Sequence, residues 1–411
     1  MRRVYMDYSA TTPIDSRVVE AMLPYLTGKF GNASSVHRFG QEARAGIDRA
    51  RRQIAELIGA RPQEIVFASG GTEANNLAIR GVAETLAAHG RHIITSSIEH
   101  PAVRAACDWL EARDWNVTRL PVYGDGIVRV EDVRAALRED TVLISVMLAN
   151  NEIGTIQPVR EIGELVRAER ASGRRHLWLH TDGVQALGRM EVNVESLGCD
   201  LLSMSAHKLY APKGVGALYV RRGVRLAAQS HGGSHERGTR AGTEAVATIV
   251  AFGHAASLAQ TESKIWIEHV RQLRDRFEAG VVAEIEDVNL NGDRVRRLPH
   301  ISNISFDFVE GEGLLINLDL QGIAVSTGSA CSSGSIEPSP IIRALGGADE
   351  RAREAVRFSI GKDTTTEEID YVLDCLPRAV ASLRQLSPRY QHHHAALRVT
   401  EETISVNASN P

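Results

Sequence analysis

Lys208 is the first residue of the chain whose type and setting suggest chemistry. It follows the apolar run 201–205 and the dipeptide Ala206-His207. An amine withdrawn from water loses part of its affinity for a proton and can then form an imine with an aldehyde. A lysine after a strand is more often simply exposed to solvent. Lys208 is therefore a candidate nucleophile whose role depends on what surrounds it.

Asp182 ends a second apolar run, which begins at Leu177. A carboxylate in this position could keep the ring nitrogen of a bound pyridine protonated. It could equally be the N-terminal cap of a helix, because aspartate is among the preferred capping residues. The sequence of this segment alone leaves both interpretations open.

A glycine turn, Ser69-Gly70-Gly71-Thr72, separates an apolar run from a helical pattern. Free backbone N–H groups at a helix start, together with a threonine hydroxyl, can bind a phosphate. No Gly-Lys-Ser/Thr sequence follows, so the turn is not a P-loop. Taken alone, it is more typical of an ordinary capped helix than of an anion site.

The four cysteines lie far apart, at positions 107, 199, 331 and 375. No CxxC pair or Cys/His spacing is present, which predicts neither a disulfide framework nor a metal site. Cys331 stands in the Ser/Gly-rich segment 326–335, where no apolar neighbour would bury it. An exposed thiol on a loop suits a nucleophile that must move. The other three lie in apolar patterns and are interpreted as packing residues.

Alternating strand and helix patterns must position these groups. Strands are expected at 64–68, 92–95, 116–122, 141–149 and 176–181, separated by helical patterns such as 39–58, 72–88, 130–138 and 158–171. This alternation predicts βαβ units and a largely parallel sheet. Such sheets bind ligands beyond the carboxyl ends of their strands, which is where Lys208 and Asp182 stand.

The pattern changes after about residue 260. A helix is expected at 263–281, and further elements follow, with strands at 284–290, 301–308 and 356–360 and helices at 311–320 and 366–385. This part predicts a smaller α+β domain.

Composition limits the classes of protein to consider. The chain has 411 residues, a net charge of −4 and 43% hydrophobic residues, which is typical of a soluble globular protein. The most apolar stretch, 142–149, is too short to cross a membrane. Arg44, Arg49, Arg51 and Arg52 are expected to form a solvated helix face rather than a nucleic-acid site. We expect a cytoplasmic protein with neither a membrane nor a nucleic-acid partner.

Taken together, these motifs resemble the pyridoxal-phosphate (PLP) cysteine desulfurases of the class V aminotransferase superfamily, in particular the iron–sulfur-cluster-assembly type. The resemblance runs from Tyr5 to about Pro388. Further matching blocks are Glu99-His100, Asn150-Asn151-Glu152-Ile153-Gly154, the segment 236–243 and Arg357-Phe358-Ser359. Each block is weak alone, whereas their common order and spacing are highly specific.

The resemblance implies an α/β fold, the PLP-dependent transferase fold type I, with a mostly parallel seven-stranded sheet. The large domain would span 15–260. The smaller α+β domain, formed by 1–14 and 261–390, would carry the cysteine loop, and 391–411 would be a polar C-terminal tail. The family further implies a homodimer with its active sites at the dimer interface.

By resemblance, Lys208 binds the cofactor covalently, Asp182 pairs with the pyridine nitrogen, Gln185 reaches the ring hydroxyl and His100 stacks on the ring and moves protons. The implied phosphate cradle is Gly71, Thr72, Ser205 and His207, with Thr243 from the other subunit. Asn151 is implied to contact the cofactor and, with Arg357, to hold the substrate carboxylate, for which a guanidinium is a natural bidentate partner.

The implied reaction converts L-cysteine to L-alanine. The Cys331 thiolate would take the sulfur as a persulfide and pass it to an acceptor protein, such as an iron–sulfur scaffold or a sulfur carrier for thiolation. A selenocysteine lyase or an aminotransferase of the same superfamily is the alternative activity. A scaffold protein with little catalysis of its own is a further alternative, against which Lys208, Asp182 and Cys331 argue.

Overall fold

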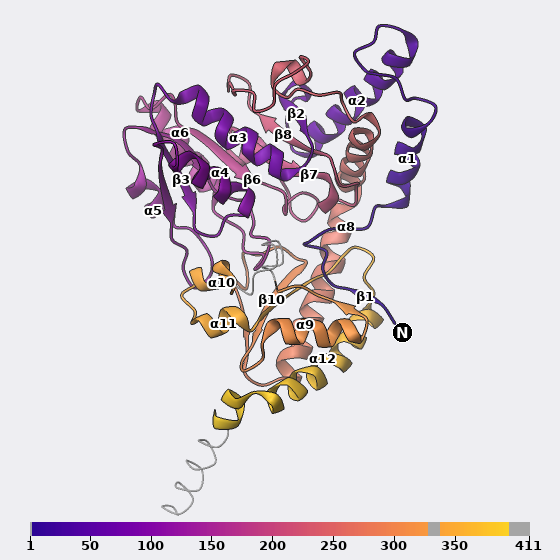
Figure 1. The fold of residues 1–411 in the computed structure, drawn as a ribbon, viewed down its shortest axis with the longest axis vertical. Coiled ribbons are helices and arrows are strands. Elements are labelled where there is room, and N and C mark those ends of the chain that lie inside the picture. Colours follow the sequence, from indigo (N-terminus) through magenta and orange to yellow (C-terminus); the bar gives the residue numbers. More distant parts are fainter. Residues whose placement is uncertain (1, 328–337, 394–411) are drawn as a thin grey trace, which may run out of the picture.

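The described part of the chain comprises two packed units joined by one long helix (Figure 1). The computed structural model describes residues 2–327 and 338–393. Cys331 and most of the predicted C-terminal tail lie outside the described residues.

A seven-stranded sheet forms the centre of the larger unit, with the strand order β2-β8-β7-β6-β5-β3-β4. Neighbours among β3 to β7 pair in parallel, whereas β8 pairs antiparallel with both β2 and β7. The predicted mostly parallel seven-stranded sheet is therefore confirmed. Its strands are β2 (Ile65–Ala68), β3 (His92–Ser96), β4 (Asn116–Leu120), β5 (Thr141–Ser145), β6 (Trp178–Asp182), β7 (Leu201–Ser205) and β8 (Gly216–Val220).

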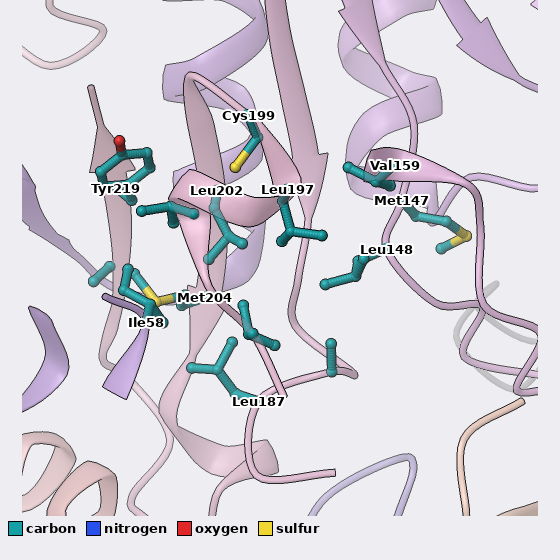
Figure 2. Close-up of a cluster of buried hydrophobic side chains, with 14 of the residues drawn as sticks. Ile58, Met147, Leu148, Val159, Leu187, Leu197, Cys199, Leu202, Met204 and Tyr219 are labelled. Carbon is teal, nitrogen blue, oxygen red and sulfur yellow. The ribbon is translucent and has the colours of Figure 1, made fainter. Parts of the chain in front are cut away.

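Helices cover both faces of this sheet, which explains why its strands, apart from the edge strand β4, are buried along almost their whole length. Leu201 packs in a core with α3 (Gly71–Leu86) and α4 (Pro101–Glu111). Its neighbour Leu202 points into the opposite core, with residues of α2 (Arg38–Leu57) and α6 (Val159–Ala171). Figure 2 shows Leu202 and Met204 in that second core, with Cys199 among the same apolar side chains. The interpretation of Cys199 as a packing residue agrees with this position.

The long helix α8 (Val246–Glu284) begins well before the predicted start at residue 263. Its first half is rich in small residues that are buried on several sides, so it shows no amphipathic stripe to detect. Gly253 allows a close approach to α2, since a Cβ at this position would lie 2.4 Å from Cα of Ala50. The helix contacts α2 in one unit and α12 (Thr366–Leu386) in the other.

The smaller unit contains a three-stranded antiparallel sheet in the order β12-β10-β9. A separate two-stranded parallel sheet includes the far N-terminus, because β1 (Val4–Tyr5) pairs with β11 (Ile323–Ala324). Val4 and Met6 pack in the core of this unit with Phe277, Phe306 and Phe358. The remaining elements here are β9 (Val288–Leu290), β10 (Ile301–Phe306), β12 (Ala355–Ser359), α9 (Gly311–Leu320), α10 (Pro340–Ala344) and α11 (Asp349–Arg353).

The remaining helices are short or lie at the edge of the larger unit. They are α1 (Ser16–Leu26), α5 (Val130–Ala136), α7 (Val194–Leu197) and the 3₁₀ turns Pro62–Glu64, Ala206–Lys208 and Glu236–Gly238. Among residues 2–327 and 338–393, no helix combines the length and the apolar character that a membrane span needs.

The prediction that Arg51 lies on a solvated face of α2 is wrong. Its guanidinium is buried and pairs with both carboxylate oxygens of Glu236, at 2.7 and 2.8 Å. Arg51 lies four residues after Ile47 and three before Ile54, so it falls on the buried stripe of the helix. Arg44, Arg49 and Arg52 are exposed as expected. The Arg51–Glu236 pair fixes the start of the segment that leads to Thr243.

Candidate active site

A cavity of about 200 Å³ lies beyond the carboxyl ends of β6 and β7. It gathers nearly every predicted site residue of the described segments, namely Gly71, Thr72, His100, Asn151, Asp182, Gln185, Ser205, His207, Lys208 and Arg357. A larger cavity of about 420 Å³ lies beside β2 and β8, but its lining residues include no lysine, histidine or cysteine. We therefore place the candidate active site in the smaller cavity.

Lys208 occupies the 3₁₀ turn that follows β7, and the N-terminal segment of the chain holds it there. Its Nζ donates hydrogen bonds to the carbonyl oxygens of Ser9 and, at 2.7 Å, of Ala10. The Thr12 hydroxyl donates to the carbonyl of His207 at 3.0 Å, which ties the same two segments together. The amine thus stands at the wall of the cavity, as a nucleophile toward a bound aldehyde requires.

Asp182, at the end of β6, presents a buried carboxylate to the cavity. Oδ1 accepts a hydrogen bond from the backbone N–H of Val184 at 2.9 Å, and Oδ2 accepts one from Asn75 Nδ2 at 2.6 Å. The alternative interpretation of Asp182 as a helix N-cap is wrong, because residues 183–190 form turns and no helix; the contact to Val184 closes the first of these turns. Because Asp182 also lines the cavity, this contact is compatible with pairing to a ring nitrogen.

The glycine turn and the residues at and after the end of β7 form part of the cavity wall. Helix α3 begins at Gly71, where a Cβ would lie only 2.7 Å from Cγ2 of Val184, so a side chain would crowd the cradle. Thr72 and Ser205 add hydroxyl groups. Burial, with the charges of Lys208 and Lys213, lowers the pKa of His207 to about 4, so its imidazole is neutral. N–H groups at a helix start and hydroxyl groups fit a phosphate.

His100 caps α4, and this fixes its tautomer. Its Nδ1 accepts a hydrogen bond from the backbone N–H of Ala102 at 3.1 Å, so the neutral ring carries its proton on Nε2. Burial lowers the pKa of His100. The negative charge of Asp182 opposes this shift, and the positive charge of Lys208 reinforces it. A neutral imidazole with one defined N–H suits the predicted stacking and proton transfer.

Arg357 and Asn151 meet at the wall of the cavity. The guanidinium is 3% exposed and donates from Nη1 to the carbonyl of Asn151 at 2.9 Å and from Nη2 to Asp7 at 2.7 Å. Its Nε has no hydrogen-bond partner in the described segments. The backbone of Arg357 also bridges to Ser326, the first residue of the Ser/Gly-rich segment 326–335. The predicted carboxylate clamp therefore lies beside the start of that segment.

Thr243 lies outside the cavity of its own chain and is exposed. The segment that carries it is fixed by the Arg51–Glu236 pair and by Arg240, which donates to Glu73 at 2.8 Å. Its predicted contribution to the phosphate site of a second subunit stays a prediction.

Glu99, beside His100, is a buried acid for which no separate role was predicted from the sequence. Its Oε1 accepts hydrogen bonds from the Ser96 hydroxyl at 2.6 Å and from the backbone N–H of Met147 at 2.9 Å. Its Oε2 has no partner within the described residues. Burial raises the pKa of Glu99 to about 8, although the two hydrogen bonds act in the opposite direction. Glu99 is therefore protonated at neutral pH.

We expect the stability of the protein to fall as the pH rises from about 4.5 to about 8, in part because of Glu99. The folded state keeps this proton through most of that range, whereas the unfolded state loses it. This difference lowers the free energy of unfolding by about 3 kcal/mol at pH 7. Glu99→Gln removes this contribution. Urea unfolding at the two ends of the range should show a smaller loss for Glu99→Gln than for the wild type or for the exposed control Glu84→Gln. Equal losses for all three would contradict the assignment.

The fold and the cavity define an α/β enzyme whose lysine and anion cradle suit a phosphorylated aldehyde. The family model for class-V aminotransferases matches residues 4–372. A cysteine desulfurase IscS from Dictyoglomus turgidum is 51% identical over 95% of this chain and 98% of its own length. The chain therefore belongs to the class-V aminotransferase family, among its cysteine desulfurases, and this family depends on PLP.

Solved structures agree with this assignment. A NifS-like protein superposes with a TM-score of 0.86 at 35% identity and covers 92% of this chain and 100% of its own. A structure described as SspA in complex with cysteine has a TM-score of 0.77 at 33% identity, and it covers 88% of this chain and 100% of its own.

Proposed function

We propose that the protein converts L-cysteine to L-alanine with PLP, moves the sulfur to Cys331 as a persulfide and passes it to an acceptor protein. The observation that carries the proposal is the convergence of Lys208, Asp182 and a glycine-based anion cradle on one cavity. The family of the chain and the cysteine-bound structural relative support the same substrate.

The cavity residues fit PLP in type and position. Gly71, Thr72, Ser205 and His207 would hold the phosphate, Asp182 the ring nitrogen and Gln185 the ring hydroxyl. Lys208 would bind the aldehyde carbon. Bound PLP supplies an electron sink for the bond electrons released at the substrate α-carbon.

In the proposed reaction, each of the side chains has a separate role. Arg357 and Asn151 hold the substrate carboxylate, and the Lys208 amine removes the proton from the α-carbon. His100 moves a proton through Nε2. The Cys331 thiolate attacks the substrate sulfur, the carbon–sulfur bond breaks, and its electron pair stays with the carbon that becomes the methyl group of alanine. Cys331 keeps the sulfur.

The proposal includes a second copy of the chain as a partner. Large apolar side chains are exposed along 14–39, including Ile14, Leu23, Leu26 and Phe30, the last 69% exposed. An apolar surface of this kind is typical of a subunit interface. A homodimer would also give the exposed Thr243 a phosphate site to complete. We further propose a cytoplasmic location, in line with the free thiols of Cys107, Cys199 and Cys375.

The experiment that tests the function is product analysis. The purified protein loaded with PLP is incubated with L-cysteine and a dithiol, with no amino-group acceptor. Alanine and sulfide should form in equal amounts. Release of a keto acid, or dependence on an added acceptor, would instead support the aminotransferase alternative. Turnover of selenocysteine without turnover of cysteine would support the lyase.

A further inference from the structure

Asn75 makes the shortest contact to the Asp182 carboxylate among the described residues. It lies on α3, is 1% exposed and lines the cavity. Its Nδ2 donates to Asp182 Oδ2 at 2.6 Å, across 107 residues of sequence. Its own Oδ1 is buried and has no hydrogen-bond partner in the described part of the chain.

The orientation of this amide follows from the charge that it faces. A carboxylate only accepts hydrogen bonds, so the NH₂ group of Asn75 must point at Asp182 and the carbonyl must point away. A buried acceptor without a donor is unfavourable, and an apolar side chain would fill the same space without that cost. Packing of α3 alone therefore does not account for an asparagine here.

We propose that Asn75 is a positioning residue for the cofactor, acting through Asp182. The neutral amide fixes one carboxylate oxygen, the Val184 N–H fixes the other, and neither brings a positive charge that would neutralise the carboxylate. The full charge of Asp182 stays available to the ring nitrogen. This inference rests on the proposed binding of PLP.

Other titratable groups face Asp182 and define the background of any pH measurement. Glu99 and His100, from the segment between β3 and α4, interact electrostatically with Asp182. Lys208 acts on His100 from the turn after β7. All three are kept in the variants below, so that only the group beside Asp182 changes.

The test uses the isosteric variant Asn75→Asp in the full-length protein. It keeps the shape of residue 75 but places a second carboxyl group against Asp182, and two carboxylates in contact cannot both ionise. The dissociation constant of PLP is measured by titrating the PLP-free protein and following the visible absorbance. Asn75→Asp should weaken binding about tenfold or more at about pH 8.5 and much less at about pH 6, where a shared proton restores a donor.

Two further variants separate positioning from packing. Asn75→Ala removes the donor and should weaken PLP binding about tenfold at both pH values. Asn76→Ala is the matched control, because Asn76 is the next residue of α3 and its side chain donates to the carbonyl of Thr72 in its own helix at 3.0 Å. This variant should bind PLP as the wild type does. If Asn75→Asp bound PLP like the wild type, or weaker by the same factor at both pH values, the proposal would be overturned. If the wild type itself bound no PLP, the proposed function would fail first.

Discussion

Lys208→Ala is expected to abolish the turnover of L-cysteine, with a loss of at least about 10³-fold. In the proposed mechanism, the variant lacks both the amine that would bind the cofactor and the base that would remove the α-proton. The wild type treated with PLP and borohydride should carry a permanent cofactor mass on the peptide that contains Lys208, and the variant should carry none. Alanine release and peptide mass spectrometry measure the two effects separately.

Lys213→Ala is the matched control for this prediction. Lys213 lies five positions later, is exposed, and is absent from the lining of the cavity. It should keep both turnover and the borohydride-fixed bond at Lys208. A Lys208→Ala protein that still fixed PLP at a single lysine would show that another amine is the nucleophile.

The position of Lys208 also shows what the sequence could and could not predict. The apolar run of β7 indicates that the lysine stands at a strand end, because buried parallel strands are apolar on both faces. The carbonyl oxygens of Ser9 and Ala10 that hold its amine come from nearly 200 residues away. Such a contact depends on how the N-terminal segment packs against the turns after β6 and β7, which no local pattern encodes.

The same distinction applies to the rest of the candidate site. Local sequence motifs were sufficient to predict part of the site, namely Gly71, Thr72, Asp182 and Arg357. Asn75 and Asp7 act through partners that are distant in sequence, Asp182 and Arg357. Arg51 shows the same limit in the fold, since a charged residue on an apolar stripe is buried only when a partner such as Glu236 arrives from another segment.

Cys331→Ala is expected to separate cofactor binding from sulfur transfer. The variant should keep the visible absorbance of bound PLP, because every described residue that lines the cavity is retained. It should release no alanine from L-cysteine, since none of the three remaining cysteines of the chain offers an accessible thiol to take the sulfur. The three other cysteines are buried, and burial raises the pKa of Cys107 and of Cys199 to about 12. A buried thiol that stays protonated at neutral pH is a poor nucleophile.

Thiol chemistry provides the control for this prediction. Iodoacetamide should modify Cys331 in the folded wild type and leave Cys107, Cys199 and Cys375 unmodified until the protein is unfolded, because alkylation requires an accessible thiolate. Cys107→Ser should keep its activity after correction for any loss of stability. A Cys331→Ala protein that released alanine at the wild-type rate would show that the sulfur leaves the substrate without passing through residue 331. The persulfide would then have to be assigned to another group or removed from the mechanism.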